Sequence, residues 1–211
     1  MNAHQEIILN RDCDAIQIPS GNILVLPAGT QVMVTQSLGG TYTVTTPGGL
    51  ARIDEKDADA LGLEKTTALT APIKTIPTGS LEEAVWDQLK TVFDPEIPVN
   101  VVDLGLIYDC AIIEEDENNL LSESSSPSEV QEVSGAQKLS ELEFSKKIKK
   151  AHVKMTLTAP GCGMGPTIAA DARNKILTID GIEEAEVELV WDPAWNQSMI
   201  SEAGRMKLGM I

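Results

Sequence analysis

Two hydrophobic periodicities divide this 211-residue sequence near residue 76. Before that point, apolar residues alternate in short runs that prolines and glycines separate, a pattern typical of β-strands. Residues 31–36 and 41–46 flank the pair Gly39–Gly40, which indicates a β-hairpin, and residues 57–61 are expected to form one helical turn. The sequence therefore predicts a small β-rich module over residues 1–76, suited to packing or to binding a partner.

A helix is expected soon after a linker over residues 70–79. Ser80 and Glu83 have the spacing of a capping box, in which each residue bonds to the backbone N–H of the other. The helix should end before Pro95, because the residue preceding a proline is pushed out of helical geometry. Its expected buried face consists of Leu81, Val85, Leu89 and Val92.

The rest of the chain alternates between strand and helix patterns. Strands are expected at residues 106–113, 152–158 and 185–191, and helices at residues 166–177 and 199–207. The order helix, strand, strand, helix, strand predicts an α+β fold over residues 80–211. In this two-layer sandwich, the helices cover one face of a small sheet.

Residues 114–150 interrupt the alternation. The segment opens with four acidic residues, continues through a serine-rich stretch and closes with the basic run at residues 146–150. Such a composition buries too little apolar surface to offset the entropy of ordering, so we expect a disordered insertion in a hairpin loop. The basic end is either a solvated charge run or a docking point for an acidic partner.

Composition excludes several classes of function. The net charge is -16, which disfavours nucleic acid and anionic membranes as partners. No apolar run approaches the roughly 20 residues that span a bilayer, and the N-terminus lacks a signal-peptide pattern, so a cytoplasmic location is expected. Three scattered cysteines are too few for a disulfide framework or a Cys-x-x-Cys zinc site, and we expect free thiols.

The candidate site is the segment from Thr156 to Thr167, where a strand should end, a glycine-rich turn follow and a helix begin. This order places Cys162 near a helix N-terminus, where the dipole favours an anion, so we expect a thiol with a lowered pKa. Glycines on both sides, Gly161 and Gly163, should leave the sulfur open to approach. A small buried cysteine in a tight turn is the equally weighted alternative.

More specific interpretations of this segment fail on particular residues. A dinucleotide-binding loop requires glycine where Pro166 stands, and a Cys–His hydrolase requires a nearby imidazole, whereas His152 lies at the far end of the preceding strand. A cluster held by protein alone usually requires four cysteines. Cys110 is expected on the strand face that packs into the hydrophobic core, and no role is assigned to Cys13.

Four separated motifs together resemble one family, in the family's order. The sequence is similar to the small domains shared by cytosolic iron–sulfur assembly factors and PaaD-like maturation proteins, and its N-terminal part, through residues 27–30, 38–44 and 57–62, resembles the SufT branch. The motifs are Asp94–Asn100, Asp103–Tyr108, Met155–Cys162 and Trp191–Trp195.

The resemblance implies an accessory role in iron–sulfur cluster assembly, not an enzymatic one. The family's reactive cysteine falls on Cys162 and its acidic loop on Asp94 and Glu96, whose carboxylates are alternatively acceptors for loop N–H groups. The supporting turn residues are Thr158, Gly161 and Gly163, and Gly163 stands where many relatives carry proline. Cys162 would hold a cluster transiently, completed by a second subunit in a homodimer or by a carrier or recipient protein. An adaptor that holds no iron and a thiol-dependent redox enzyme are the alternatives.

Overall fold

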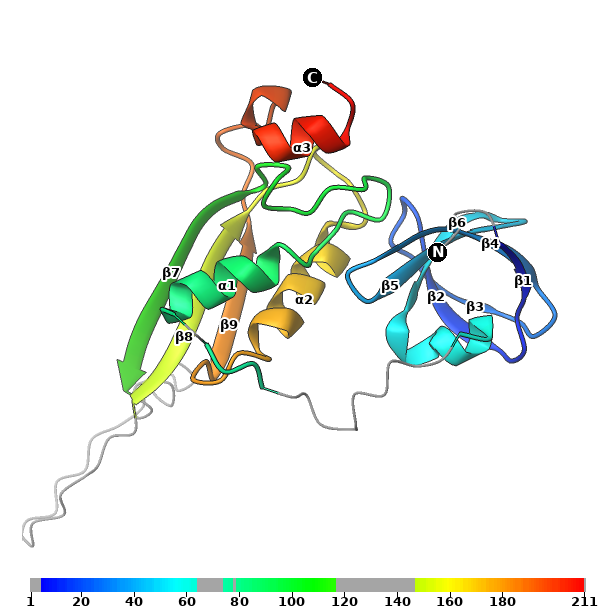
Figure 1. Ribbon diagram of the computed structural model, residues 1–211, viewed down its shortest axis with the longest axis horizontal. Coiled ribbons are helices and arrows are strands. Elements are labelled where there is room, and N and C mark those ends of the chain that lie inside the picture. The colour runs from blue at the N-terminus through cyan, green and yellow to red at the C-terminus, as the bar shows by residue number, and fades with distance from the viewer. Residues whose placement is uncertain (1–4, 64–73, 78, 117–146, 211) are drawn as a thin grey trace, which may run out of the picture.

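The computed structural model describes residues 5–63, 74–77, 79–116 and 147–210. These residues form two sheets, one of six strands and one of three, together with helices that cover the smaller sheet (Figure 1). The predicted α+β class is confirmed. Residues 70–73 and 78 of the expected linker and residues 117–146 of the expected insertion lie outside the described residues.

The N-terminal β module is an antiparallel sheet with the strand order β1-β4-β5-β6-β2-β3, followed by the 3-10 helix η1. The predicted hairpin is β4 and β5, joined by Gly39 and Gly40, whose φ angles of 62° and 77° suit a tight turn. Leu9, Val32 and Ile53 belong to the module's own core. The elements are β1 (Gln5–Ile8), β2 (Cys13–Gln17), β3 (Ile23–Leu26), β4 (Gln31–Leu38), β5 (Thr41–Thr46), β6 (Gly49–Asp54) and η1 (Glu55–Leu61).

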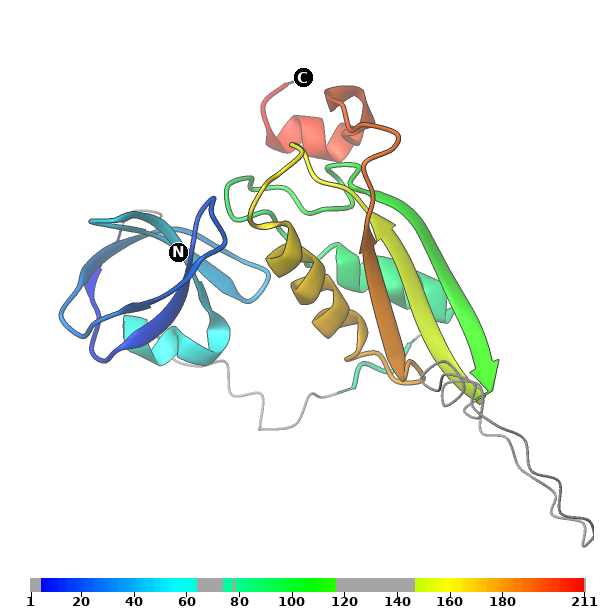
Figure 2. The same cartoon turned by 180° about the vertical axis from the view of Figure 1, so that it is seen from behind.

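The C-terminal unit has the predicted order and layering. Strand β8 pairs antiparallel with β7 and parallel with β9, and α1 and α2 lie on one face of this sheet (Figures 1 and 2). No helix among the described residues is both long and apolar enough to cross a membrane. The elements are α1 (Leu81–Leu89), β7 (Ile107–Asp116), β8 (Lys147–Met155), α2 (Gly165–Ile176), β9 (Glu184–Leu189), η3 (Gln197–Met199) and α3 (Glu202–Lys207).

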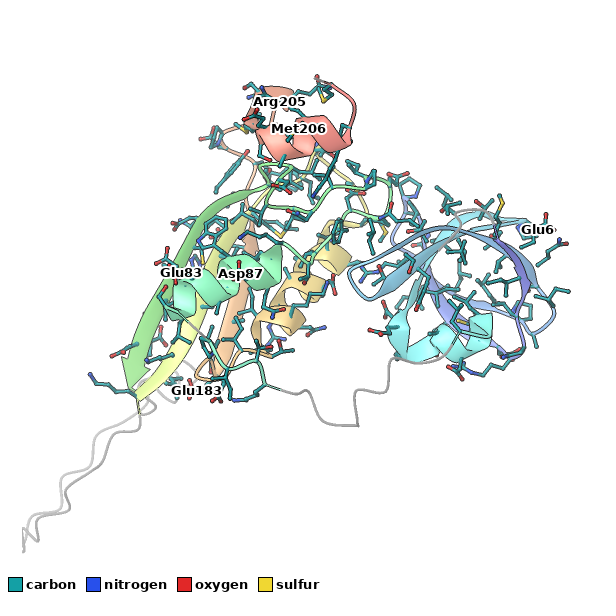
Figure 3. The ribbon with its side chains drawn as sticks, viewed as in Figure 1. Glu6, Glu83, Asp87, Glu183, Arg205 and Met206 are labelled. Atoms are coloured by element: carbon teal, nitrogen blue, oxygen red, sulfur yellow. The ribbon has the colours of Figure 1, made fainter. Side chains whose placement is uncertain are left out.

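Helix α1 begins where the capping box predicts and ends earlier than expected. Ser80 Oγ accepts the N–H of Glu83, and the Glu83 carboxylate accepts the N–H of Ser80, both at 3.1 Å. Figure 3 shows Glu83 and Asp87 on the helix's outer side, away from the sheet. The helix stops at Leu89, and a tight turn carries buried Val92 into the core instead of a further helical turn.

The ends of the expected insertion are strand, which corrects its predicted bounds of 114–150. Glu114 and Glu115 on β7 pair with Lys149 and Ile148 on β8, so the hairpin stem continues past the predicted loop start. The Glu114 carboxylate lies 3.8 Å from the ammonium groups of both Lys147 and Lys149. Opposite charges across neighbouring strands stabilise the ladder, although in sequence they look like a solvated charge run.

The module and the C-terminal unit share packed surface. Ile18, which follows β2, is 5% exposed and belongs to the hydrophobic core that α1, α2 and the smaller sheet form. Thr75, in the middle of the predicted linker, donates its N–H to the carbonyl of Thr178, and its own carbonyl accepts the N–H of Asp180. This part of the linker therefore lies against the C-terminal unit, and the division at residues 76 and 80 remains a prediction.

Ile18→Ala should lower the free energy of unfolding by about 2–5 kcal/mol, because it removes a buried side chain from a shared core. Chemical denaturation of the full chain measures the change. Ile23→Ala is the matched control, since Ile23 on β3 is 81% exposed, and it should shift stability by only about 0.5 kcal/mol or less. Equal losses in the two variants would contradict the shared core.

Candidate functional site

Cys162 lies in the turn between β8 and α2. The helix starts at Gly165, one residue before the predicted start at residue 166, so the cysteine precedes it by three residues. The Cys162 carbonyl accepts the N–H of Gly165 at 3.1 Å, which ties the turn to the start of the helix. Its side chain is half-buried against the core of the C-terminal unit.

The two glycines beside Cys162 have different surroundings. Around Gly161 a side chain would meet nothing within 4 Å, so that side of the turn is open. At Gly163 a Cβ would overlap the carbonyl oxygen of Ser20 in the N-terminal module. The structure thus leaves space beside Gly161 and packs Gly163 closely against the module, and access to the sulfur from both sides remains a prediction. Thr158, at the start of the turn, is half-buried.

Asp94 and Glu96, the acidic pair of the sequence analysis, have opposite exposure. Asp94 is 7% exposed, and its Oδ1 accepts the N–H of Glu96 at 2.9 Å, whereas the Glu96 side chain is exposed. Burial raises the pKa of Asp94, and the bond from the Glu96 N–H opposes this only in part. Asp94 is thus built into the loop, and Glu96 faces solvent.

Donors from the N-terminal module hold this acidic loop. Thr43 Oγ1 on β5, 3% exposed, donates to the carbonyl of Pro95 at 3.1 Å, and Gln36 Nε2 on β4 donates to the carbonyl of Asp94 at 3.3 Å. Carbonyl groups that leave water need such partners. Sequence reasoning missed both donors, since a threonine and a glutamine on a strand carry no signal of a distant loop.

Lys175 on α2 completes the joint between the two units. Its ammonium donates to the carbonyls of Thr91, at 2.6 Å, and Gly39, at 2.8 Å, and lies 3.3 Å from Asp171. Burial lowers the pKa of Lys175, and Asp171 opposes that shift. Buried Arg52 approaches Asp171 at 3.5 Å across a cleft of about 480 Å³ between α2 and the module. The joint is therefore polar and charged at its edge.

Two of the four motifs, residues 103–108 and 191–195, contact each other directly. Trp195 Nε1 donates to the carbonyl of Leu104 at 2.8 Å, and the Tyr108 hydroxyl donates to the carbonyl of Pro193 at 2.8 Å. Burial alone would raise the pKa of Asp103, but bonds from Ser201, Lys207 and Asn100 outweigh it and lower the pKa. The structure thus joins residues 103–108 and 191–195, two of the four motifs.

The three cysteines differ in chemical availability. Burial raises the pKa of Cys13 and of Cys110 to about 11, so both thiols stay protonated near neutral pH, and Cys162 is the one that is not fully buried. Within the described residues, no group of three or more His, Cys, Asp or Glu side chains is arranged to hold a metal ion.

The model of a family described as iron-sulfur cluster assembly protein matches residues 82–119 and 131–189. A maturation auxiliary factor for Fe–S proteins from Porphyromonas gingivalis is 33% identical over 130 residues, which are 62% of this chain and 92% of the relative. This chain belongs to that family. The SufT-type resemblance is confirmed, since the maturation auxiliary factor SufT from Staphylococcus aureus is 28% identical over 56% of this chain and 98% of its own.

The match to iron–sulfur cluster assembly proteins covers the segments that contain Cys162, Asp94 and Glu96. Residues 1–81 lie outside it. A crystal structure of a domain of unknown function from Bacillus anthracis is 28% identical, with a TM-score of 0.43, covering 62% of this chain and 93% of that one. Because the family match begins at residue 82, it does not describe the contacts of the N-terminal module with the loops at Asp94 and Cys162.

Asp94→Asn should stabilise the protein at neutral pH, because the amide oxygen of the new side chain could still accept the Glu96 N–H without burying a charge. The raised pKa makes the folded wild type bind a proton more readily than the unfolded chain. Wild-type stability from this group is therefore present at low pH and lost as the pH rises through the raised pKa. Thermal melts should show the variant's advantage at pH 7 and its decline toward pH ~4. A variant less stable at pH 7 would show that the charge is favourable.

Proposed function

We propose that this protein is a non-catalytic accessory factor that receives an iron–sulfur cluster on Cys162 and passes it to recipient proteins. One observation carries the proposal: in the segment that the family model matches, Cys162 is a thiol within reach of solvent, whereas Cys110 is buried in β7. A thiolate is the form that ligates iron. The open side at Gly161 provides room for the incoming cluster.

The transfer is an exchange of ligands at iron. The Cys162 thiol loses its proton to solvent, the resulting thiolate forms an Fe–S bond, and one thiolate of the donor protein leaves that iron. A thiolate of the recipient then displaces Cys162 in the same way, so no electron is gained or lost. The remaining ligands come from the donor, the recipient or a second copy of this chain, because the described residues of the site supply a single thiol.

The names of the relatives support a role of this kind. The two relatives from Porphyromonas gingivalis and Staphylococcus aureus are described as auxiliary factors in maturation of Fe–S proteins, a description of assistance and not of catalysis. The single thiol among the described residues of the site also favours a second candidate, an adaptor that brings carrier and recipient together without holding iron. Anaerobic reconstitution with iron and sulfide separates the two, since iron-dependent absorbance that disappears in Cys162→Ser supports the thiol mechanism.

Cys162→Ser should keep the fold and abolish support for an iron–sulfur enzyme in cells, because the side chain is half-buried in a turn and the hydroxyl is a poor ligand for iron. Cys110→Ser is the matched control in the same unit. It should retain that support and cost roughly 1–3 kcal/mol, since a hydroxyl there replaces a buried thiol without an assured partner.

Thermal melts of both variants and aconitase activity in complemented cells measure the two effects. If Cys162→Ser unfolds while Cys110→Ser is stable and inactive, the roles of the two cysteines are reversed. If neither substitution changes client activity, function does not depend on a thiol, and the adaptor replaces the proposed mechanism.

A further inference from the structure

The turn between β2 and β3 lies against the loop that carries Cys162. Both views place the blue loop between β2 and β3 beside the yellow segment that leads from β8 into α2 (Figures 1 and 2). The turn is closed by two backbone bonds of 2.8 Å, from Gln17 N to the carbonyl of Asn22 and from Gly21 N to the carbonyl of Gln17. Ser20 Oγ adds a bond to the Gln17 side chain at 3.2 Å. The turn therefore holds its shape by its own contacts.

The contact between this turn and the Cys162 loop is backbone on backbone. A Cβ at Gly21 would overlap the carbonyl oxygen of Gly163, and a Cβ at Gly163 would overlap that of Ser20. The approach is therefore possible only because both positions are glycine. Gly163 is the residue next to Cys162, so any shift at the contact moves the thiol directly.

We propose that the Gln17–Asn22 turn of the N-terminal module is a positioning element for Cys162. It fixes the Gly163 side of the loop and leaves the Gly161 side as the direction from which a cluster-bearing partner approaches. This inference rests on the proposed function in so far as Cys162 is the working thiol. The positioning itself is a statement about the loop and can be measured without any client protein.

The module's second contact with the site supports the same role. Thr43 and Gln36 hold the carbonyls of Pro95 and Asp94 from neighbouring strands of the same sheet. One rigid sheet thus fixes both the cysteine loop and the acidic loop. A sheet that only covered apolar surface would not require donors aimed at the two loops that carry the candidate residues.

Gly21→Ala in the full chain tests the contact, and Gly29→Ala is its matched control. Both glycines have left-handed φ angles, 75° and 84°, so alanine strains both turns in the same way. Only at Gly21 does the added Cβ meet the Cys162 loop, since nothing lies within 4 Å of the corresponding atom at Gly29. The measurement is the rate of alkylation of Cys162 by iodoacetamide in the folded protein, followed by mass spectrometry.

We expect Gly21→Ala to alkylate severalfold faster than Gly29→Ala, because the loop loses its fixed side and the thiol becomes more exposed. Equal rates in the two folded variants would overturn the positioning role. Should Gly21→Ala not fold, Gly163→Ala tests the same contact from the other side, because its Cβ would overlap the carbonyl oxygen of Ser20, and an alkylation rate equal to wild type would likewise overturn the positioning role.

Client activity in cells distinguishes the two proposals. If the alkylation rates differ and Cys162→Ser nevertheless supports the client enzyme, the positioning role stands and the thiol mechanism fails. If the rates are equal and Cys162→Ser is inactive, the thiol mechanism stands and the positioning role fails.

Discussion

The structure depends on hydrogen-bond donors for the backbone carbonyl groups of an irregular, partly buried loop. The segment from Thr91 to Glu96 is neither helix nor strand, so its carbonyl groups cannot bond within a regular element. Lys175 donates to Thr91, Gln36 to Asp94 and Thr43 to Pro95, and two of these three donors come from the N-terminal module. The Asp94 carbonyl also accepts the N–H of Ile97 at 3.2 Å, so Gln36 adds a second bond there, whereas Thr43 supplies the donor for the Pro95 carbonyl. A buried carbonyl left without a donor costs on the order of 1–3 kcal/mol, so the module stabilises the acidic loop chiefly through Thr43.

The joint between the units combines this polar edge with a small apolar centre. Ile18 reaches into the C-terminal core, while Lys175 and Arg52 lie at the periphery with Asp171 between them. Removing a cation from water costs free energy, so these two ion pairs add little net stability. They instead favour one placement of the module, because Arg52 and Lys175 can approach Asp171 together only in that placement. The acidic loop and the Cys162 loop therefore both contact the N-terminal module.

The sequence predicts the elements well and their mutual contacts poorly. The capping box at Ser80 and the hairpin at Gly39–Gly40 are local signals, because all the bonds involved connect residues close in sequence. The stem of the long hairpin escapes sequence reasoning because Glu114 and Lys149 stabilise each other from opposite ends of the expected insertion, and each alone looks like part of a solvated charge run. Cys162 and Asp94 emerge as candidates from sequence, but no local pattern connects the acidic loop to Thr43, whose hydroxyl donates to the carbonyl of Pro95.

The contact between Gly163 and Ser20 shows how a residue distant in sequence can change the structural role of a motif residue. Considered locally, a glycine directly after the cysteine loosens the turn. In the folded chain the same glycine lets the module's turn approach so closely that a side chain would overlap Ser20. A proline ring at this position would displace either the module or the Cys162 loop, because both contacting surfaces are backbone and neither can rotate away. The turn after Cys162 is therefore held both by its own backbone bond, from the Gly165 N–H to the Cys162 carbonyl, and by the close approach of the module at Gly163.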